Sequence, residues 1–91
     1  MSNGDSIDFA DEKALLEAIL FLESEPVEVK TLAKVSGLST DQTRTVLQEL
    51  SRDYQAPHHG LEIVHISNGY QLAPKKQLWE QLKSRYGKKN D

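Results

Sequence analysis

The most constraining feature of this sequence is the order in which its apolar patterns change period. Three segments repeat apolar residues every three or four positions, and two short apolar runs then flank Ser67-Asn68-Gly69. Asn-Gly between apolar runs is the strongest short signal for a β-hairpin, so we predict Asn68 and Gly69 as the turn. Three short helices cannot enclose a core, and the hairpin is expected to cover their open side. The order predicts an α+β fold, a winged helix.

The first helix is predicted over 11–23, with Asp8 or Asp11 capping its start and Pro26 beyond its end. Helical spacing of about 100° per residue gives it two apolar faces. The broader face, expected in the core, contains Leu15, Leu16, Ile19, Leu20 and Leu22. The opposite strip contains Ala14, Ala18 and Phe21. A surface helix usually buries one stripe, so we interpret the second strip as a dimer or protein interface.

The next two helices have helix-turn-helix spacing. The second is predicted over 29–36, and Gly37 stands where a left-handed C-terminal cap is needed. Ser39 with Gln42 three residues later is a capping-box signature for the third helix. The face of that helix expected to be buried contains Thr43, Val46, Leu47, Leu50 and Tyr54.

The hairpin strands are predicted over 61–66 and 70–73. One hairpin face contains Leu61, Ile63, His65, Tyr70 and Leu72, and the other contains Val64, Ile66 and Ala73. After Pro74, a C-terminal helix has an apolar stripe of Leu78, Trp79, Leu82 and Tyr86. Two apolar faces still lack a cover: the strip of Ala14, Ala18 and Phe21, and the hairpin face with Val64 and Ile66. The C-terminal helix either folds back over one of these faces or leaves both exposed. It cannot cover both, so a partner or a dimer contact is expected.

The domain boundaries follow from composition. We expect a winged-helix domain over 11–86, a flexible N-terminal tail over 1–10 and a polar tail over 87–91. Residues 1–29 have eight acids against one lysine, a net charge of −7, whereas residues 75–91 have six bases against two acids, a net charge of +4. The basic segment is either a solvated surface or a patch for an acidic partner. No apolar run approaches the ~20 residues of a membrane span.

Catalysis and cofactor binding are not expected. The absence of cysteine excludes disulfides, thiolate metal sites and cysteine nucleophiles, and suits a cytoplasmic protein. His58 and His59 are adjacent in a loop, but two ligands do not make a metal site. His65 lies mid-strand, where a partly buried, hydrogen-bonded histidine is the ordinary expectation. There is no nucleotide-binding or hydrolase motif.

DNA binding is the alternative that a winged helix raises. The third helix would be the recognition helix, and Arg44, Gln48 and Arg52 could contact bases. That helix has a net charge of −1, and the hairpin turn contains no lysine or arginine. Winged-helix proteins that bind DNA hold its phosphates with several lysine or arginine residues on these two elements. Because this sequence has few of them there, DNA binding is the second hypothesis.

Four segments in order resemble the N-terminal domain of segregation and condensation protein B, ScpB. They are LLEAILFLESEPV (15–27), TLAKVSGLS (31–39), GLEIV (60–64) and NGYQLAP (68–74). The resemblance covers about residues 11–85. Asn68 stands where the family pattern often has glycine.

The resemblance implies a non-enzymatic subunit of the bacterial SMC–ScpA–ScpB condensin-like complex. Such proteins bind the kleisin ScpA, which bridges the SMC ATPase heads, and they dimerise through the first of two winged-helix domains. The implied location is the cytoplasm, at the nucleoid. The chain stops after the first domain, so we expect part of a longer protein. Ala14, Ala18 and Phe21 are our own candidates for the dimer contact, which the resemblance does not assign.

Overall fold

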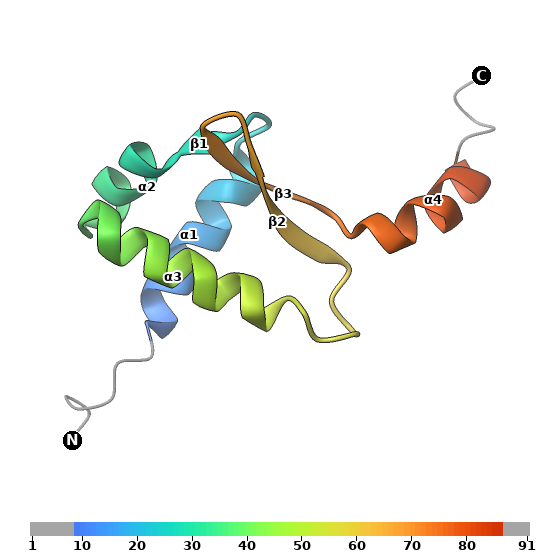
Figure 1. Ribbon diagram of the computed structural model, residues 1–91, viewed down its shortest axis with the longest axis horizontal. Helices are drawn as coiled ribbons and strands as arrows, with labels where there is room; N and C mark the ends of the chain where they lie inside the picture. Colours follow the sequence, from blue (N-terminus) through green and yellow to red (C-terminus); the bar gives the residue numbers. More distant parts are fainter. Residues whose placement is uncertain (1–8, 87–91) are drawn as a thin grey trace.

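Three helices form the body of the protein, a small sheet lies across them, and a fourth helix projects from one side (Figure 1). The computed structural model describes residues 9–86. Its elements are α1 (Ala10–Leu22), β1 (Val27–Glu28), α2 (Val29–Ser36), α3 (Thr40–Asp53), β2 (Leu61–Ile66), β3 (Gly69–Pro74), the 3₁₀ turn η1 (Lys76–Leu78) and α4 (Trp79–Tyr86). The predicted α+β winged-helix order is confirmed.

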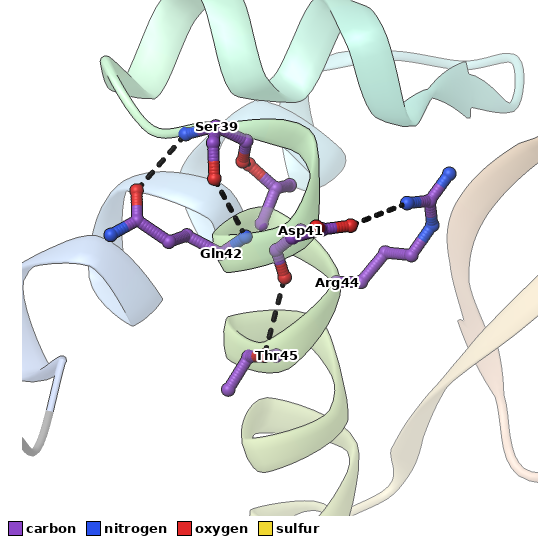
Figure 2. Close-up of polar contacts among 6 residues, drawn as sticks. Ser39, Asp41, Gln42, Arg44 and Thr45 are labelled. Atoms are coloured by element: carbon purple, nitrogen blue, oxygen red, sulfur yellow. Dashed lines mark hydrogen bonds and ion pairs between the residues drawn. The ribbon is translucent and has the colours of Figure 1, made fainter.

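The boundary between α2 and α3 follows the predicted local signals. Gly37 follows α2 with φ 77°, and its N–H donates to the Ala33 carbonyl at 2.9 Å. The Gln42 N–H then donates to Ser39 Oγ at 3.0 Å, and the Ser39 N–H donates to Gln42 Oε1 at 3.1 Å (Figure 2). These bonds satisfy backbone groups at the end of α2 and the start of α3 and so define the short turn between them.

The start of α1 differs from the expectation. The helix begins at Ala10, and the preceding residue Phe9 has φ 53° and makes no side-chain cap. Asp11 lies in the first turn and does not cap it, whereas Asp8 lies outside the described residues. Phe9 packs partly buried against the core, so this residue and Ala10 are structured parts of the segment expected as a tail. The remainder of that tail (1–8) and the 87–91 tail lie outside the described residues.

The sheet contains a strand that the sequence did not reveal. Its order is β1-β3-β2, and β1 places Val27 opposite Tyr70 and Glu28 opposite Gly69. Two residues are too short to show an alternating pattern, so β1 was missed. The strand ties the segment after α1 to the hairpin.

The hairpin turn lies one residue earlier than predicted. Ile66 is opposite Gly69, so Ser67 and Asn68 are the turn residues, and Ser67 has φ 56°. Shifting the turn by one residue moves the strand pairing by two, which leaves every side chain on its predicted face. Gly69 is needed for another reason. A Cβ there would lie 2.8 Å from the Pro26 carbonyl carbon and 2.9 Å from the Val27 nitrogen.

The core lies where α1, α2 and α3 meet beneath the sheet. Its buried cluster contains Leu16, Leu20, Val27, Leu32, Val46 and Leu47. The predicted hairpin face packs on this cluster through Ile63, Tyr70 and Leu72. His65, on the same face, was expected to be partly buried but is exposed, because it lines an open hollow near the turn, beside Lys30 and Arg44. Its ring stacks on Tyr70, with centroids 4.4 Å apart.

The junction between the sheet and α4 is anchored by Lys75. Its side chain is buried and donates through Nζ to the Ala56 carbonyl at 3.1 Å, and its N–H donates to the Gly60 carbonyl at 2.9 Å. The Lys76 N–H donates to Glu62 Oε2 at 3.2 Å. One base of the basic C-terminal segment is therefore part of the fold and is not free for a partner.

Candidate protein-interaction surface

An apolar surface on α1 is the main candidate site. Ala14, Ala18 and Phe21 are all exposed, and Phe21 keeps 76% of its surface accessible. Leu15 and Leu22, which the sequence pattern assigned to the core, are also exposed, at 41% and 77%. They lie beside the predicted strip on the helix circumference and widen it. We call this surface the α1 strip; its members are Ala14, Leu15, Ala18, Phe21 and Leu22.

The core contacts of α1 explain why the sequence pattern missed Leu15 and Leu22. Only Leu16 and Leu20 are buried in this helix, with Ile19 partly buried. The elements that pack on α1 are α2, α3 and β3, and they cover only the side that carries Leu16 and Leu20. A clue was present in the sequence: Leu22 is the last helical residue before the polar run Glu23-Ser24-Glu25, where little of the domain can cover it.

Polar contacts fix the rotation of α1 and so keep the strip outward. Lys13 Nζ lies 2.9 Å from Asp53 Oδ2 and 3.8 Å from Glu49 Oε1, both on α3. The Tyr54 hydroxyl, just beyond α3, donates to the Glu17 carboxylate. Together with buried Leu16 and Leu20, these contacts hold one side of α1 against α3. The opposite side therefore faces solvent.

The hydroxyl of Tyr54 remains protonated to unusually high pH. Burial raises the pKa of the Tyr54 phenol above its ordinary value, and the hydrogen bond and charge of Glu17 raise it further. His59 packs edge-on against the Tyr54 ring, with centroids 5.4 Å apart. These contacts tie α1 and the loop after α3 to the Tyr54 ring.

The C-terminal helix, α4, covers neither the α1 strip nor the outer face of the hairpin. It packs on η1 and points away from α1 in Figure 1, so it does not fold back over the α1 strip. On the outer hairpin face, Ile66 is exposed, and Val64 and Ala73 are partly covered. Trp79 of α4 is itself 46% exposed. Of the two arrangements that the sequence left open, the structure has the one in which α4 is extended.

The residues named for DNA contact lie along one open groove. Arg44, Gln48 and Arg52 line it from α3, and Tyr70 closes it from β3. The groove encloses roughly 400 Å³. Arg44 Nη1 lies 3.3 Å from Asp41 Oδ1 in an exposed pair, which partly offsets its charge (Figure 2). The structure therefore brings the three residues together.

The histidines form no metal centre in the part of the chain that the structure describes. The rings of His58 and His59 lie side by side, with centroids 4.3 Å apart. Within residues 9–86, no group of three histidine or acidic side chains is placed to hold a metal ion. No helix in the same range is long and apolar enough to cross a membrane.

Comparison with known proteins gives consistent matches. The family model described as segregation and condensation complex subunit ScpB matches residues 14–91. Segregation and condensation protein B of Symbiobacterium thermophilum is 37% identical over 68 residues, which cover 75% of this chain and 31% of the relative. The protein of the same name in Desulforamulus reducens is 33% identical over 81 residues, 88% of this chain and 45% of the relative. The chain thus spans less than half of either relative.

Solved structures match the fold as well. A crystal structure of a dimer of the ScpB N-terminal domain complexed with a ScpA peptide superposes with a TM-score of 0.79 at 28% identity, covering 84% of this chain and 88% of that one. ScpB from Mycobacterium tuberculosis gives a TM-score of 0.81 at 19% identity, covering 94% of this chain and 54% of that one, which supports the fold. The chain belongs to the segregation and condensation protein B family.

Proposed function

We propose that this chain is the dimerisation module of a ScpB-type subunit, acting in chromosome condensation and segregation within the SMC–ScpA–ScpB complex. The observation that carries the proposal is the α1 strip, an exposed apolar surface on a fold that matches a dimeric ScpB N-terminal domain. Aromatic side chains such as Phe21 are enriched in the centres of protein interfaces. The dimer contact assigned to Ala14, Ala18 and Phe21 is part of this proposal.

The proposed partners are a second copy, the kleisin ScpA and, through ScpA, the SMC ATPase. The similar solved dimer holds a ScpA peptide, which supports the kleisin as a partner. In this proposal the folded unit over 11–86 works in the cytoplasm at the nucleoid as a scaffold. It uses no cofactor and performs no catalysis, and its contact with DNA is at most indirect or weak.

A pull-down tests the assembly directly. The tagged protein is used as bait in a nuclease-treated lysate of its own bacterium, and the captured proteins are identified by mass spectrometry. The proposal predicts recovery of a kleisin and an SMC ATPase. Their absence from the nuclease-treated sample, together with capture only when DNA is intact, would contradict it.

DNA binding remains the second candidate function, because one groove collects Arg44, Gln48 and Arg52. It predicts affinity for duplex DNA that falls steeply with salt and is lost in Arg44→Ala and Arg52→Ala. A duplex titration at low salt decides the point. No binding there would remove this candidate and leave the scaffold function.

A further inference from the structure

The exposed stripe of α4 is apolar like the α1 strip, and the charges beside it are of the opposite sign. Trp79, Leu82 and Tyr86 share one side of α4 at helical spacing, with Lys83 beside them on one flank and Arg85 on the other. Glu80 and Ser84 lie on the far side. Since Trp79 is 46% exposed and Leu82 is only partly buried, this stripe is available for packing.

The α1 strip has carboxylates at the corresponding places. Glu12 lies on one flank, Asp11 at the N-terminal end of the strip, and Glu17, whose carboxylate also accepts from the Tyr54 hydroxyl, on the other flank. The one base of this helix, Lys13, is already paired with Asp53 and Glu49. An apolar stripe edged by bases is complementary to an apolar strip edged by acids. The eight residues of α4 span about 12 Å, and the thirteen of α1 span about 20 Å, so one fits along the other.

The α4 of the same chain is held away from this surface. Only four residues separate β3 from α4, and Lys75 and Lys76 fix that junction to Ala56, Gly60 and Glu62. With these bonds in place, only Gln77 and Leu78 remain to redirect the chain before α4 begins. In Figure 1, α4 projects away from the body of the molecule, whereas α1 lies within it.

We infer that α4 of one copy packs on the α1 strip of a second copy, with Lys83 and Arg85 facing the acidic flanks of that strip. Each copy gives its α4 to the α1 strip of the other, so the two contacts are related by a two-fold axis and the dimer exchanges its C-terminal helices. This inference rests on the proposed function, since it assumes that two copies associate through α1. It adds the segment of the partner that occupies the strip.

Cysteine cross-linking tests the contact, because the natural chain has no thiol. Ala18→Cys and a size-tagged Leu82→Cys are mixed, oxidised gently and separated without reductant. The expected result is that the mixed dimers shift to a band containing one chain of each kind. The matched control is Ser84→Cys on the far side of α4, for which this mixed band is lost.

Three other outcomes would overturn the inference, and they separate its failure from that of the proposed function. Cross-linking of Ala18→Cys with itself, without the mixed band, would show two α1 helices face to face and would leave the proposed dimer intact. A disulfide formed within single chains of an Ala18→Cys/Leu82→Cys double variant would show that α4 folds back over α1 of its own chain. A single-chain mass for the unmodified protein at sedimentation equilibrium would remove the dimer itself.

Discussion

At the scale of single residues, Tyr54 joins α1 to the end of α3. Its ring is buried, and its hydroxyl donates to Glu17. Tyr54→Phe keeps the ring and removes the donor, leaving a carboxylate that water can reach. We expect a loss of about 1 kcal/mol in the free energy of unfolding, measured by urea denaturation near neutral pH. No loss would show that Glu17 is not anchored by this bond.

The same tyrosine predicts a pH dependence. Its pKa is raised in the folded state, mainly by burial, so the unfolded chain loses the phenolic proton first. Stability from this group is complete below the unfolded pKa of about 10 and falls as pH rises above it. The free energy of unfolding should therefore fall more between about pH 8 and pH 11 in the natural protein than in Tyr54→Phe. Parallel curves would contradict the buried, protonated phenol.

Gly69 shows how one missing Cβ permits a strand pairing. A methyl group there would meet the backbone of Pro26 and Val27 closer than 3 Å, so β1 would have to move. Gly69→Ala should cost roughly 1–3 kcal/mol in thermal or urea unfolding. Gly60→Ala is the matched control, since its methyl group would meet only Leu78 Cδ1 at an ordinary 3.5 Å. Equal effects of the two substitutions would contradict the close approach of β1.

At the scale of elements, the capping box at Ser39 determines where α3 begins. Ser39→Ala removes the oxygen that accepts the Gln42 N–H and should cost about 1 kcal/mol in urea unfolding. Thr45→Ala is the control on the same helix, since this exposed hydroxyl bonds only within α3, to the Asp41 carbonyl (Figure 2). Alanine has the higher helix propensity, so no loss is expected there. Equal losses would show that the cap does not fix this end.

Elements set by neighbouring residues could be predicted from the sequence, and those set by distant contacts could not. The cap at Gly37 and the box at Ser39 involve residues no more than four positions apart. In contrast, β1 exists because Val27 meets Tyr70, and the turn moved to Ser67-Asn68 because Gly69 is committed to that pairing. The direction of α4 likewise depends on Lys75 reaching Ala56. None of these contacts leaves a periodic signal.

The candidate site was predictable in part for the same reason. Helical spacing alone identified Ala14, Ala18 and Phe21 as a second apolar strip. Whether Leu15 and Leu22 join it depends on how much of α1 the other elements cover, and the short α2, α3 and sheet cover only the Leu16 and Leu20 side. The groove residues Arg44, Gln48 and Arg52 were named from the predicted recognition helix, whereas Tyr70 joins them through tertiary packing.

At the scale of the whole molecule, the domain closes one core and leaves a large apolar surface on α1. Burying Phe21 in a dimer is worth about 1.5–3 kcal/mol per copy. Phe21→Glu removes this contribution and adds a charge to a surface already edged by acids. Both copies lose this contribution, about 3–6 kcal/mol per dimer, so the dissociation constant of the dimer should rise by at least roughly a hundredfold, since 1.4 kcal/mol corresponds to a factor of ten. The fold should be unaffected, because Phe21 contributes little to the core.

Sedimentation equilibrium of the natural protein and of Phe21→Glu is the most direct measurement of whether this domain dimerises through α1. The expected masses are two chains for the natural protein and one for the variant, with unchanged circular dichroism. Val35→Glu, at an exposed apolar position on α2, is the matched control and should remain a dimer. A natural protein that sediments as a single chain, or a Phe21→Glu variant that remains a dimer, would contradict dimerisation through the α1 strip.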